Sequence, residues 1–479
     1  MKKDKIPILI SRSILGESIN ISIVFYRIRT SRIIGWVVLM LYALSLYIFA
    51  PKDYSLQFNT ACTISYIVVI YIYYKEVHKK NYMDFDTIFF IAYFFVSFFY
   101  PTFIYPVNPE MFWMFQYHTE EAIISKASAL SLVGIIAYMY GSITFRPSKN
   151  NFKRTYRPLK TNSLFVASAV SFLIYILLGG YSALKNTYAN GERDEGGLYA
   201  YFSIIVYVCI FCMISIWFMN SYSISKTKLQ RKCFPVVQIA YILVYMSFLV
   251  IAGSRGKVLN IILLSFGLYA YLYKPFSFRK VIILCGFGMV GMFAIMIYRS
   301  GGSFSFGSLS EIAMDLIINN HNTYESMTIV DKSGLSYGRS MLSYLLGVIP
   351  FLQGLFFGFT GIDPDTANSA MIITQSTLGT TEGTGTGTTI IADIYLAFGT
   401  IGVILMMGFL GRFIRKLLYY AHRNIYYLLI YGVLMGMSVY MARAEFFYPA
   451  KTILWCCVLI LVVKQNTSTF NVSRRLSMQ

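Results

Sequence analysis

Residues 199–219 read YAYFSIIVYVCIFCMISIWFM and contain no charged side chain. A helix of about 20 mostly apolar residues is long enough to cross the hydrocarbon core of a bilayer. Eleven further runs have this character or come close to it, and they cover residues 33–50, 59–74, 87–105, 123–145, 163–180, 234–252, 257–273, 280–298, 389–410, 425–441 and 446–463. The sequence therefore predicts an all-α polytopic membrane protein with about 12 transmembrane helices.

The composition agrees with this class of protein. Hydrophobic residues make up 57% of the chain and charged residues 13%, whereas soluble domains are about 25% charged. All seven cysteines lie in apolar runs or at the edge of one. Cys209 and Cys212 form a CxxC without a second pair of ligands, so we expect ordinary packing there instead of a metal site or disulfide.

The basic residues alternate from one side of the predicted spans to the other. Thirty of the 41 lysines and arginines fall on the side that holds both termini, and 16 of the 21 acidic residues fall on the opposite side. Positive charge gathers on the cytoplasmic side of membrane proteins, so we expect both termini to be cytoplasmic. Residues 1–32 are expected to lie on the inner membrane surface and not to form a signal peptide. This distribution explains the net charge of +20 without nucleic acid as a partner.

One long segment, residues 299–388, separates the ninth and tenth predicted spans and is expected on the outer side. It divides the chain into a bundle of about nine spans (1–298), this extracytoplasmic loop (299–388), and C-terminal helices with a cytoplasmic tail (389–479). Loops of this length are uncommon and often functional. Short helical patterns occur at 308–320 and 364–377.

Two features of the long segment need separate interpretations. Residues 341–360 are apolar, but Pro350 interrupts a continuous helix. A single crossing there would also turn every later loop to the wrong side, so we predict a re-entrant or interfacial segment. The run GTGTGT at 383–388 lacks the spacing and the lysine of a P-loop, and we predict a flexible hinge.

Arginine is scarce on the predicted outer face, where it occurs at Arg193, Arg255, Arg299, Arg339 and Arg443. The last four lie at the ends of predicted helices or in the long segment. Arginine carries a permanent charge and a planar fork that suits bidentate contacts with phosphate. The sequence therefore predicts that these four arginines form a site for a phosphate or pyrophosphate headgroup.

Few residues on this face could exchange a proton. His321 and Glu325 are four residues apart and would share one face of a helix, and Asp393 is a carboxylate inside a predicted span, where such groups are usually functional. The alternative is structural: a solvated histidine, a buried pair of Asp393 with an arginine, and arginines that snorkel to headgroups or pair with Glu445 or a nearby carboxylate. No metal-binding, protease or nucleotide motif is present, so no metal or cofactor is expected.

Four short motifs resemble those of bacterial oligosaccharide repeat-unit polymerases, the Wzy-type O-antigen or capsule polymerases. They are AGSRGK (252–257), IYRSGG (297–302), GTTIIADIYLAFGTIG (387–402) and RAEFFYPAKTILW (443–455). The architecture of about twelve spans with one late outer loop is similar over most of the chain.

This resemblance implies a glycosyltransferase in the bacterial cytoplasmic membrane that moves a growing glycan from undecaprenyl pyrophosphate to a sugar hydroxyl of the next lipid-linked unit. It implies pyrophosphate binding by Arg255 and Arg299, with Arg443 a plausible third. Membrane lipids, a chain-length regulator and a flippase of the same pathway are its implied partners. Three alternatives stay open: an O-antigen ligase, a polytopic acyltransferase, and a lipid-linked oligosaccharide flippase, although no internal repeat of the transporter kind is visible.

Overall fold

The computed structural model describes residues 30–117, 120–147, 156–184, 197–299, 314–382 and 385–476, and this part of the chain is helical without a strand. The basic N-terminal segment up to residue 29 and Arg193 lie outside the described residues.

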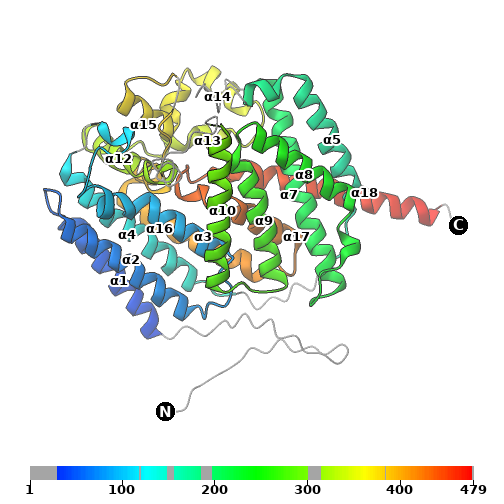
Figure 1. The fold of residues 1–479 in the computed structure, drawn as a ribbon, viewed down its shortest axis with the longest axis horizontal. Helices are drawn as coiled ribbons and strands as arrows, with labels where there is room; N and C mark the ends of the chain where they lie inside the picture. The colour runs from blue at the N-terminus through cyan, green and yellow to red at the C-terminus, as the bar shows by residue number, and fades with distance from the viewer. Residues whose placement is uncertain are drawn as a thin grey trace, which may run out of the picture.

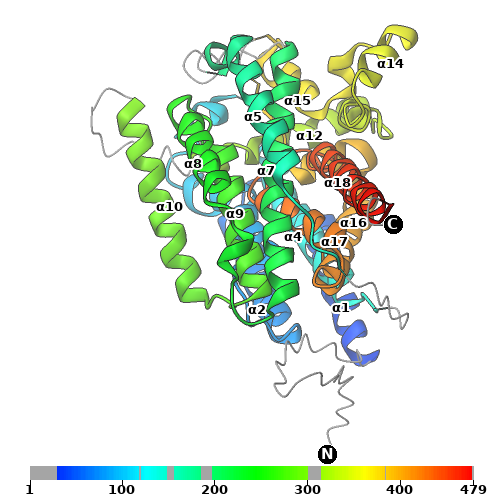
Figure 2. The same cartoon turned by 90° about the vertical axis from the view of Figure 1, so that its right-hand side faces the viewer.

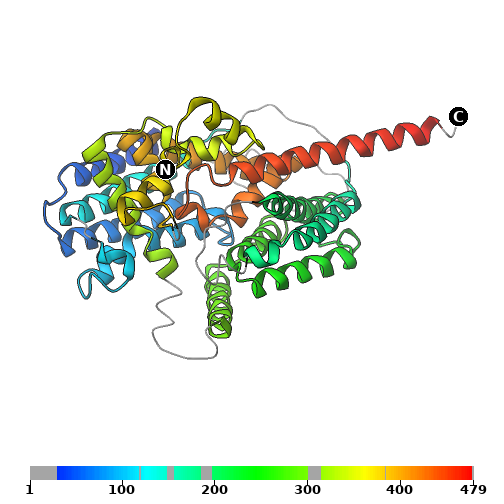
Figure 3. The same cartoon turned by 90° about the horizontal axis from the view of Figure 1, so that it is seen from above.

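The helices form two groups that lie side by side (Figure 1). The first group contains α1 (Thr30–Ile48), α2 (Leu56–Glu76), α3 (Phe85–Phe94) with its π-helical continuation η1 (Phe95–Ile104), α4 (Glu121–Ile143) and α16 (Ile390–Tyr420). The second contains α5 (Asn162–Leu177), α7 (Leu198–Ile224), α8 (Val236–Ile251), α9 (Arg255–Leu272) and α10 (Phe278–Arg299). Between them, α17 (Ile425–Gly436) packs against α7, α9 and α16. The last helix, α18 (Ala450–Leu476), runs across the second group at a steep angle (Figure 3).

Each of the twelve apolar runs overlaps one of these helices, so the helical class is confirmed. Within the described residues, five helices are long and apolar enough to cross a membrane: Leu56–Glu76, Phe85–Ile104, Glu121–Ile143, Leu198–Ile224 and Ile390–Tyr420. Four more apolar helices are shorter than a full span. The chain is thus a multi-pass membrane protein, while the count of twelve spans stays a prediction.

Glycines bring α4 and α16 into direct backbone contact. A Cβ atom on Gly141 would lie 1.9 Å from the carbonyl oxygen of Gly408, and one on Gly411 would lie 1.9 Å from the carbonyl oxygen of Tyr138. Only glycine fits at such a crossing, and small residues are what allow helices to pack closely in a membrane. Beyond this crossing α16 bends at Gly399, whose φ of 64° is left-handed.

The segment between α10 and α16 folds into short helices at one end of the bundle (Figure 1). They are α12 (Asn320–Ser333), η4 (Arg339–Met341), α13 (Leu342–Leu346), α14 (Leu352–Thr360), η5 (Pro364–Ala367) and α15 (Ser369–Leu378). The predicted interruption at Pro350 is confirmed, because α13 ends before it and α14 begins after it. The helical pattern at 364–377 corresponds to η5 and α15. The outer position of the segment stays a prediction.

The prediction of a flexible hinge is wrong for the described part of the GTGTGT run. Thr386 and Thr388 are buried. The main-chain nitrogen of Thr386 donates to Thr374 Oγ1, and its carbonyl accepts from Asn322. Gly385 and Gly387 allow the described part of the run to follow a tight path between α12 and α15.

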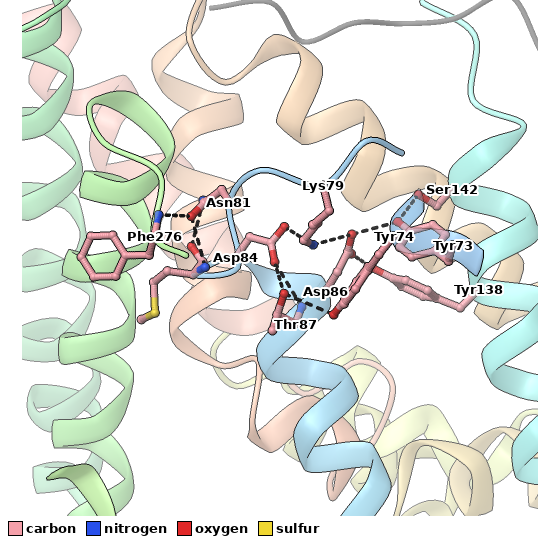
Figure 4. Close-up of polar contacts among 11 residues, drawn as sticks. Tyr73, Tyr74, Lys79, Asn81, Asp84, Asp86, Thr87, Tyr138, Ser142 and Phe276 are labelled. Atoms are coloured by element: carbon pink, nitrogen blue, oxygen red, sulfur yellow. Dashed lines mark hydrogen bonds and ion pairs between the residues drawn. The ribbon is translucent and has the colours of Figure 1, made fainter. Parts of the chain in front are cut away.

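A buried ionic network joins α2, α3 and α4 (Figure 4). Nζ of Lys79 lies 2.5 Å from Oδ2 of Asp84 and 3.7 Å from Oδ2 of Asp86. Asp86 also accepts hydrogen bonds from the hydroxyls of Tyr73, at 2.8 Å, and Tyr138, at 2.5 Å. Every oxygen of Asp86 therefore has a donor, as a buried carboxylate requires.

The turn that carries Lys79 also contacts the second group of helices. Oδ1 of Asn81 accepts from the main-chain nitrogen of Phe276, in the turn between α9 and α10, and the nitrogen of Tyr82 donates to the carbonyl of Phe276 (Figure 4). The turn after α2 thus fixes the ends of both groups.

We expect Lys79→Met to lower the stability of the protein by about 3–5 kcal/mol, because it removes the ammonium group that pairs with the buried Asp84 and Asp86. Thermal unfolding of the purified protein in detergent measures the loss. Adding Asp84→Asn should restore part of it. Lys80→Met removes the same charge from an exposed neighbour, and equal unfolding temperatures for the two lysine variants would contradict the assignment.

Candidate active site

Two of the arginines singled out in the sequence meet at Asp315. Arg255 is the first residue of α9, and its Nη2 lies 3.4 Å from Oδ2 of Asp315. Arg443 follows the short helix η6 (Tyr440–Ala442), and its Nη1 donates to the main-chain oxygen of Asp315 at 2.6 Å. The side chain of Arg255 remains 22% exposed. Each guanidinium group carries five N–H donors, so both arginines keep donors for a further anionic group.

Glycine and an aromatic ring hold these two arginines in place. A Cβ atom on Gly256 would lie 1.8 Å from the hydroxyl of Tyr440, so a larger residue where α9 meets η6 would displace the Tyr440 ring. The guanidinium of Arg443 lies over the ring of Tyr440, 4.8 Å from its centroid, and such a cation–π contact orients the planar group. The start of α9 and the turn after η6 therefore form one rigid corner.

Two buried carboxylates lie beside this corner. Asp393, in the first turn of α16, is fully buried, and its Oδ2 accepts from the main-chain nitrogen of Phe446 at 2.9 Å. Glu445 is 5% exposed and bonds to the hydroxyl of Tyr344. Burial, followed by the negative charge of Asp393, raises the pKa of Glu445 to about 7. A carboxyl group with such a pKa exchanges protons readily near neutral pH.

The first turns of α12 connect the arginine corner with the start of α16. Nδ2 of Asn319 donates to the carbonyl of Asp315 at 2.7 Å, and Nδ2 of Asn322 donates to the carbonyl of Thr386 at 2.9 Å. The hydroxyls of Thr323 and Thr389 lie 2.9 Å apart. One polar cluster thus runs from Asp315 to the beginning of α16.

Several polar atoms of α12 have no partner within the protein. The described part of the chain contains eleven buried side-chain nitrogen and oxygen atoms without a hydrogen bond, and five of them belong to Asn320, His321, Asn322 and Tyr324. The ring of His321 packs on that of Phe115, with centroids 6.1 Å apart, and burial lowers the pKa of His321 to about 4. Buried polar atoms without partners are costly, so this turn is suited to a polar ligand.

The other sequence candidates lie elsewhere. The carboxylate of Glu325 accepts a hydrogen bond from Ser376 of α15. Arg339 is exposed in η4, and its Nη2 donates to the hydroxyl of Thr366 at 2.7 Å. Arg299 is the last residue of α10, and its side chain lies outside the described residues. The structure therefore joins Arg255, Arg443 and Asp393 into one region and does not bring Arg339 to Asp315.

Sequence reasoning missed two residues of this region. Asp315 lies within the helical pattern predicted for residues 308–320, and nothing in that pattern marks it as the partner of arginines 60 and 128 positions away. The sequence suggested Glu445 only as one possible partner of an outer-face arginine, whereas Arg443 donates to the main-chain oxygen of Asp315. The sequence does contain a clue to Glu445, because this residue is a carboxylate in the otherwise apolar stretch EFFYPA.

No group of three or more His, Cys, Asp or Glu side chains is arranged to hold a metal ion within the described ranges. Cys209 and Cys212 are buried, free thiols, as expected for ordinary packing.

The fold and this site define a polytopic membrane protein with a cationic corner beside buried acid–base groups. A sequence model of the family described as "O-antigen polysaccharide polymerase Wzy" matches residues 31–470. The chain therefore belongs to this family, which supports a function as an O-antigen polymerase of the glycosyltransferase type. No curated protein and no solved structure matches the chain.

The raised pKa of Glu445 predicts how stability depends on pH. The unfolded chain releases this proton near the ordinary pKa of 4.5, whereas the folded protein holds it until about pH 7. The folded state thus binds more protons between these values, and its stability falls as pH rises through this window. We expect Glu445→Gln to unfold near the wild-type temperature at pH 4.5 and at a higher temperature at pH 8.

Differential scanning fluorimetry of the purified protein across this pH range tests the prediction. Glu110→Gln changes the same charge at an exposed position and should leave the pH dependence unaltered. A Glu445→Gln variant whose unfolding temperature follows the wild-type curve at every pH would refute it.

Proposed function

We propose that the protein polymerises lipid-linked oligosaccharide repeat units at the outer face of the bacterial cytoplasmic membrane. The growing glycan moves from undecaprenyl pyrophosphate to a sugar hydroxyl of the next unit. Membership of the polymerase family supports the reaction class, and the convergence of Arg255 and Arg443 on one aspartate is the observation that carries the proposed mechanism.

The arginine corner suits a pyrophosphate leaving group. Two guanidinium groups meet at one aspartate, whose carboxylate pairs with Arg255 while its main-chain oxygen accepts from Arg443, so the corner keeps a surplus of positive charge. When the bond between the anomeric carbon and the pyrophosphate oxygen breaks, its electron pair stays on that oxygen. Donors placed in advance where negative charge develops stabilise the transition state, and Arg255 and Arg443 occupy that role. Arg299, at the end of α10, is a third candidate.

The buried carboxylates suit the other half of the reaction. The acceptor hydroxyl oxygen forms the new bond to the anomeric carbon and must lose its proton to a base. We assign the base to the pair of Glu445 and Asp393, because the pKa of Glu445 is close to physiological pH. His321 is a second candidate: its low pKa keeps the imidazole neutral, so that it can accept a hydrogen bond from a sugar hydroxyl.

The free polar atoms of Asn320, His321 and Asn322 support carbohydrate binding next to these groups. Sugars present many hydroxyls, each able to donate and accept. A hydroxyl that pairs with a buried amide or imidazole removes the cost of leaving that group unsatisfied. Holding both substrates in this way aligns the hydroxyl with the anomeric carbon.

We expect a strain that lacks the protein to make surface glycan with a single repeat unit instead of a ladder. In that strain Arg255→Ala and Arg443→Ala should fail to restore the ladder, because loss of one donor to a developing charge slows a reaction by about 100-fold or more. Arg443→Lys should restore it weakly, since lysine keeps the charge but loses the planar fork. Gel electrophoresis of surface polysaccharide, with immunoblots for protein abundance, measures these outcomes.

Arg339→Ala serves as the matched control, because Arg339 bonds to Thr366 and not to Asp315, and it should leave the ladder intact. Wild-type ladders from both Arg255→Ala and Arg443→Ala would disprove the phosphate role. Loss of all glycan attachment from the deletion strain would indicate a ligase instead of a polymerase.

The proposed base predicts that the rate rises with pH. Glu445 must be ionised to accept a proton, so the initial rate of the purified enzyme should increase with a midpoint near pH 7. Glu445→Gln should be slower by about 100-fold and should lose this midpoint. Polymer formation from lipid-linked units between pH 5.5 and 8.5 gives the measurement, and an unchanged midpoint in Glu445→Gln would exclude Glu445 as the base.

A further inference from the structure

The helical hairpin of α13 and α14 exposes an apolar surface at the end of the molecule that holds the candidate site. Residues 341–360 contain no charged side chain. On α14, Leu355 is 59% and Phe359 is 87% exposed. Figure 2 shows α14 projecting beyond the bundle near α18. Such a surface is stable where lipid covers it.

The hairpin is fixed to the bundle by specific contacts. Nε1 of Trp455, on α18, donates to the carbonyl of Val348 at 3.0 Å. The ring of Phe351 stacks on that of Tyr201, on α7, with centroids 5.6 Å apart. Between the hairpin and these two helices lies an open cavity of about 900 Å³. The cavity is therefore built by three separate elements.

Two glycines leave the inner side of α14 open. Gly354 and Gly358 line the cavity one helical turn apart. A Cβ atom at either position would have no protein atom within 4 Å. These glycines are not needed for helix packing, in contrast to those between α4 and α16, and their effect is to widen the cavity.

One cation faces this apolar cavity. Lys451, in the first turn of α18, is half-buried, and its ammonium lies 5.9 Å from the ring centroid of Tyr201 and 6.0 Å from that of Trp455. It has no ion-pair partner among the described residues. Asp363 also lines the cavity, but its carboxylate accepts from the nitrogen of Asp365. A half-buried lysine without a carboxylate partner indicates an anionic ligand.

We propose that this cavity binds the polyprenyl chain of a second lipid-linked substrate, the acceptor unit, with Lys451 on its phosphate group. The apolar hairpin with its two open glycines receives the branched isoprenoid units, and the single cation receives the charge at their end. This assignment rests on the proposed polymerase function, which requires two lipid-linked molecules at the same time.

The donor's pyrophosphate gains negative charge during the reaction and the acceptor's does not, and this difference assigns the donor to the arginine corner and the acceptor to the cavity. The donor's pyrophosphate becomes a leaving group, and its developing charge requires the two guanidinium groups at Asp315. The acceptor's pyrophosphate is not displaced, so it needs only to be held, and one lysine is sufficient. Tyr344 of α13 bonds to Glu445, so the hairpin links the cavity to the proposed base.

Photo-crosslinking of the full-length protein in nanodiscs of phosphatidylcholine tests the proposal. The probe is a sugar-free polyprenyl pyrophosphate with a diazirine in its first isoprenoid units, and crosslinked peptides are identified by mass spectrometry. We expect crosslinks within residues 347–361. Lys451→Gln should reduce them by about tenfold, the usual effect of losing one charge-assisted hydrogen bond, and Lys451→Arg should retain them.

Gly358→Leu tests the cavity by filling it. Because no atom lies near a Cβ at this position, the variant should fold and lose the hairpin crosslinks, while crosslinks near Arg255 and Arg443 persist. Gly288→Leu introduces the same side chain at an equally open position on α10, and Lys332→Gln removes a lysine outside the cavity. Both controls should match the wild type.

Wild-type crosslinking of the hairpin in Lys451→Gln and Gly358→Leu would overturn the proposal. Complete competition by phosphatidylglycerol added in tenfold excess would also overturn it, since the cavity would then hold ordinary membrane lipid. These measurements need no turnover. A deletion strain that keeps its glycan ladder would refute the proposed polymerase function and leave the lipid-binding result standing.

Discussion

The contact between the backbones of α4 and α16 is the constraint on which the candidate site depends. Apolar side chains gain little from meeting each other inside a lipid bilayer, so helices there are held by close packing. Gly141 and Gly411 allow each helix to touch the other's carbonyl groups, and α12 packs on both helices. The bend at Gly399 then sets the direction of the first turns of α16, which carry Asp393. A shift at the crossing would therefore move Asp393 and the polar turn of α12 together.

The distribution of charge in the site follows from how Asp315 uses its oxygens. Its carboxylate pairs with Arg255, but Arg443 binds its main-chain carbonyl, which carries no net charge. Two guanidinium groups are thus held by one negative charge. The second potential counter-ion, Glu445, bonds to Tyr344 instead, and the negative charge of Asp393 helps to raise its pKa. Separation of the carboxylates from Arg443 keeps the corner cationic and leaves the pKa of Glu445 at about 7, two properties that a direct Arg443–Glu445 pair would remove.

The helices could be predicted from the sequence because hydrophobicity over about 20 residues is a local property. All twelve predicted runs are helical, whereas their number of crossings and their orientation depend on a bilayer and stay predictions. Arg255 and Arg443 were identifiable because charge is rare on that side of the chain. Asp315 was not, since its role arises from contacts with residues far away in the sequence. The burial of Glu445 and the lack of hydrogen-bond partners for His321 depend on how the helices pack, which a short sequence motif does not reveal.

The two halves of the proposed reaction are held by different partners, although Arg443 and Glu445 are only two residues apart. Arg443 donates to the main-chain oxygen of Asp315, whereas burial and the charge of Asp393 raise the pKa of Glu445. In the proposed reaction the leaving pyrophosphate and the acceptor hydroxyl therefore meet separate groups, and the short segment from Arg443 to Glu445 sets the spacing between those groups. That spacing matters because the acceptor hydroxyl must be aligned with the anomeric carbon when the pyrophosphate leaves.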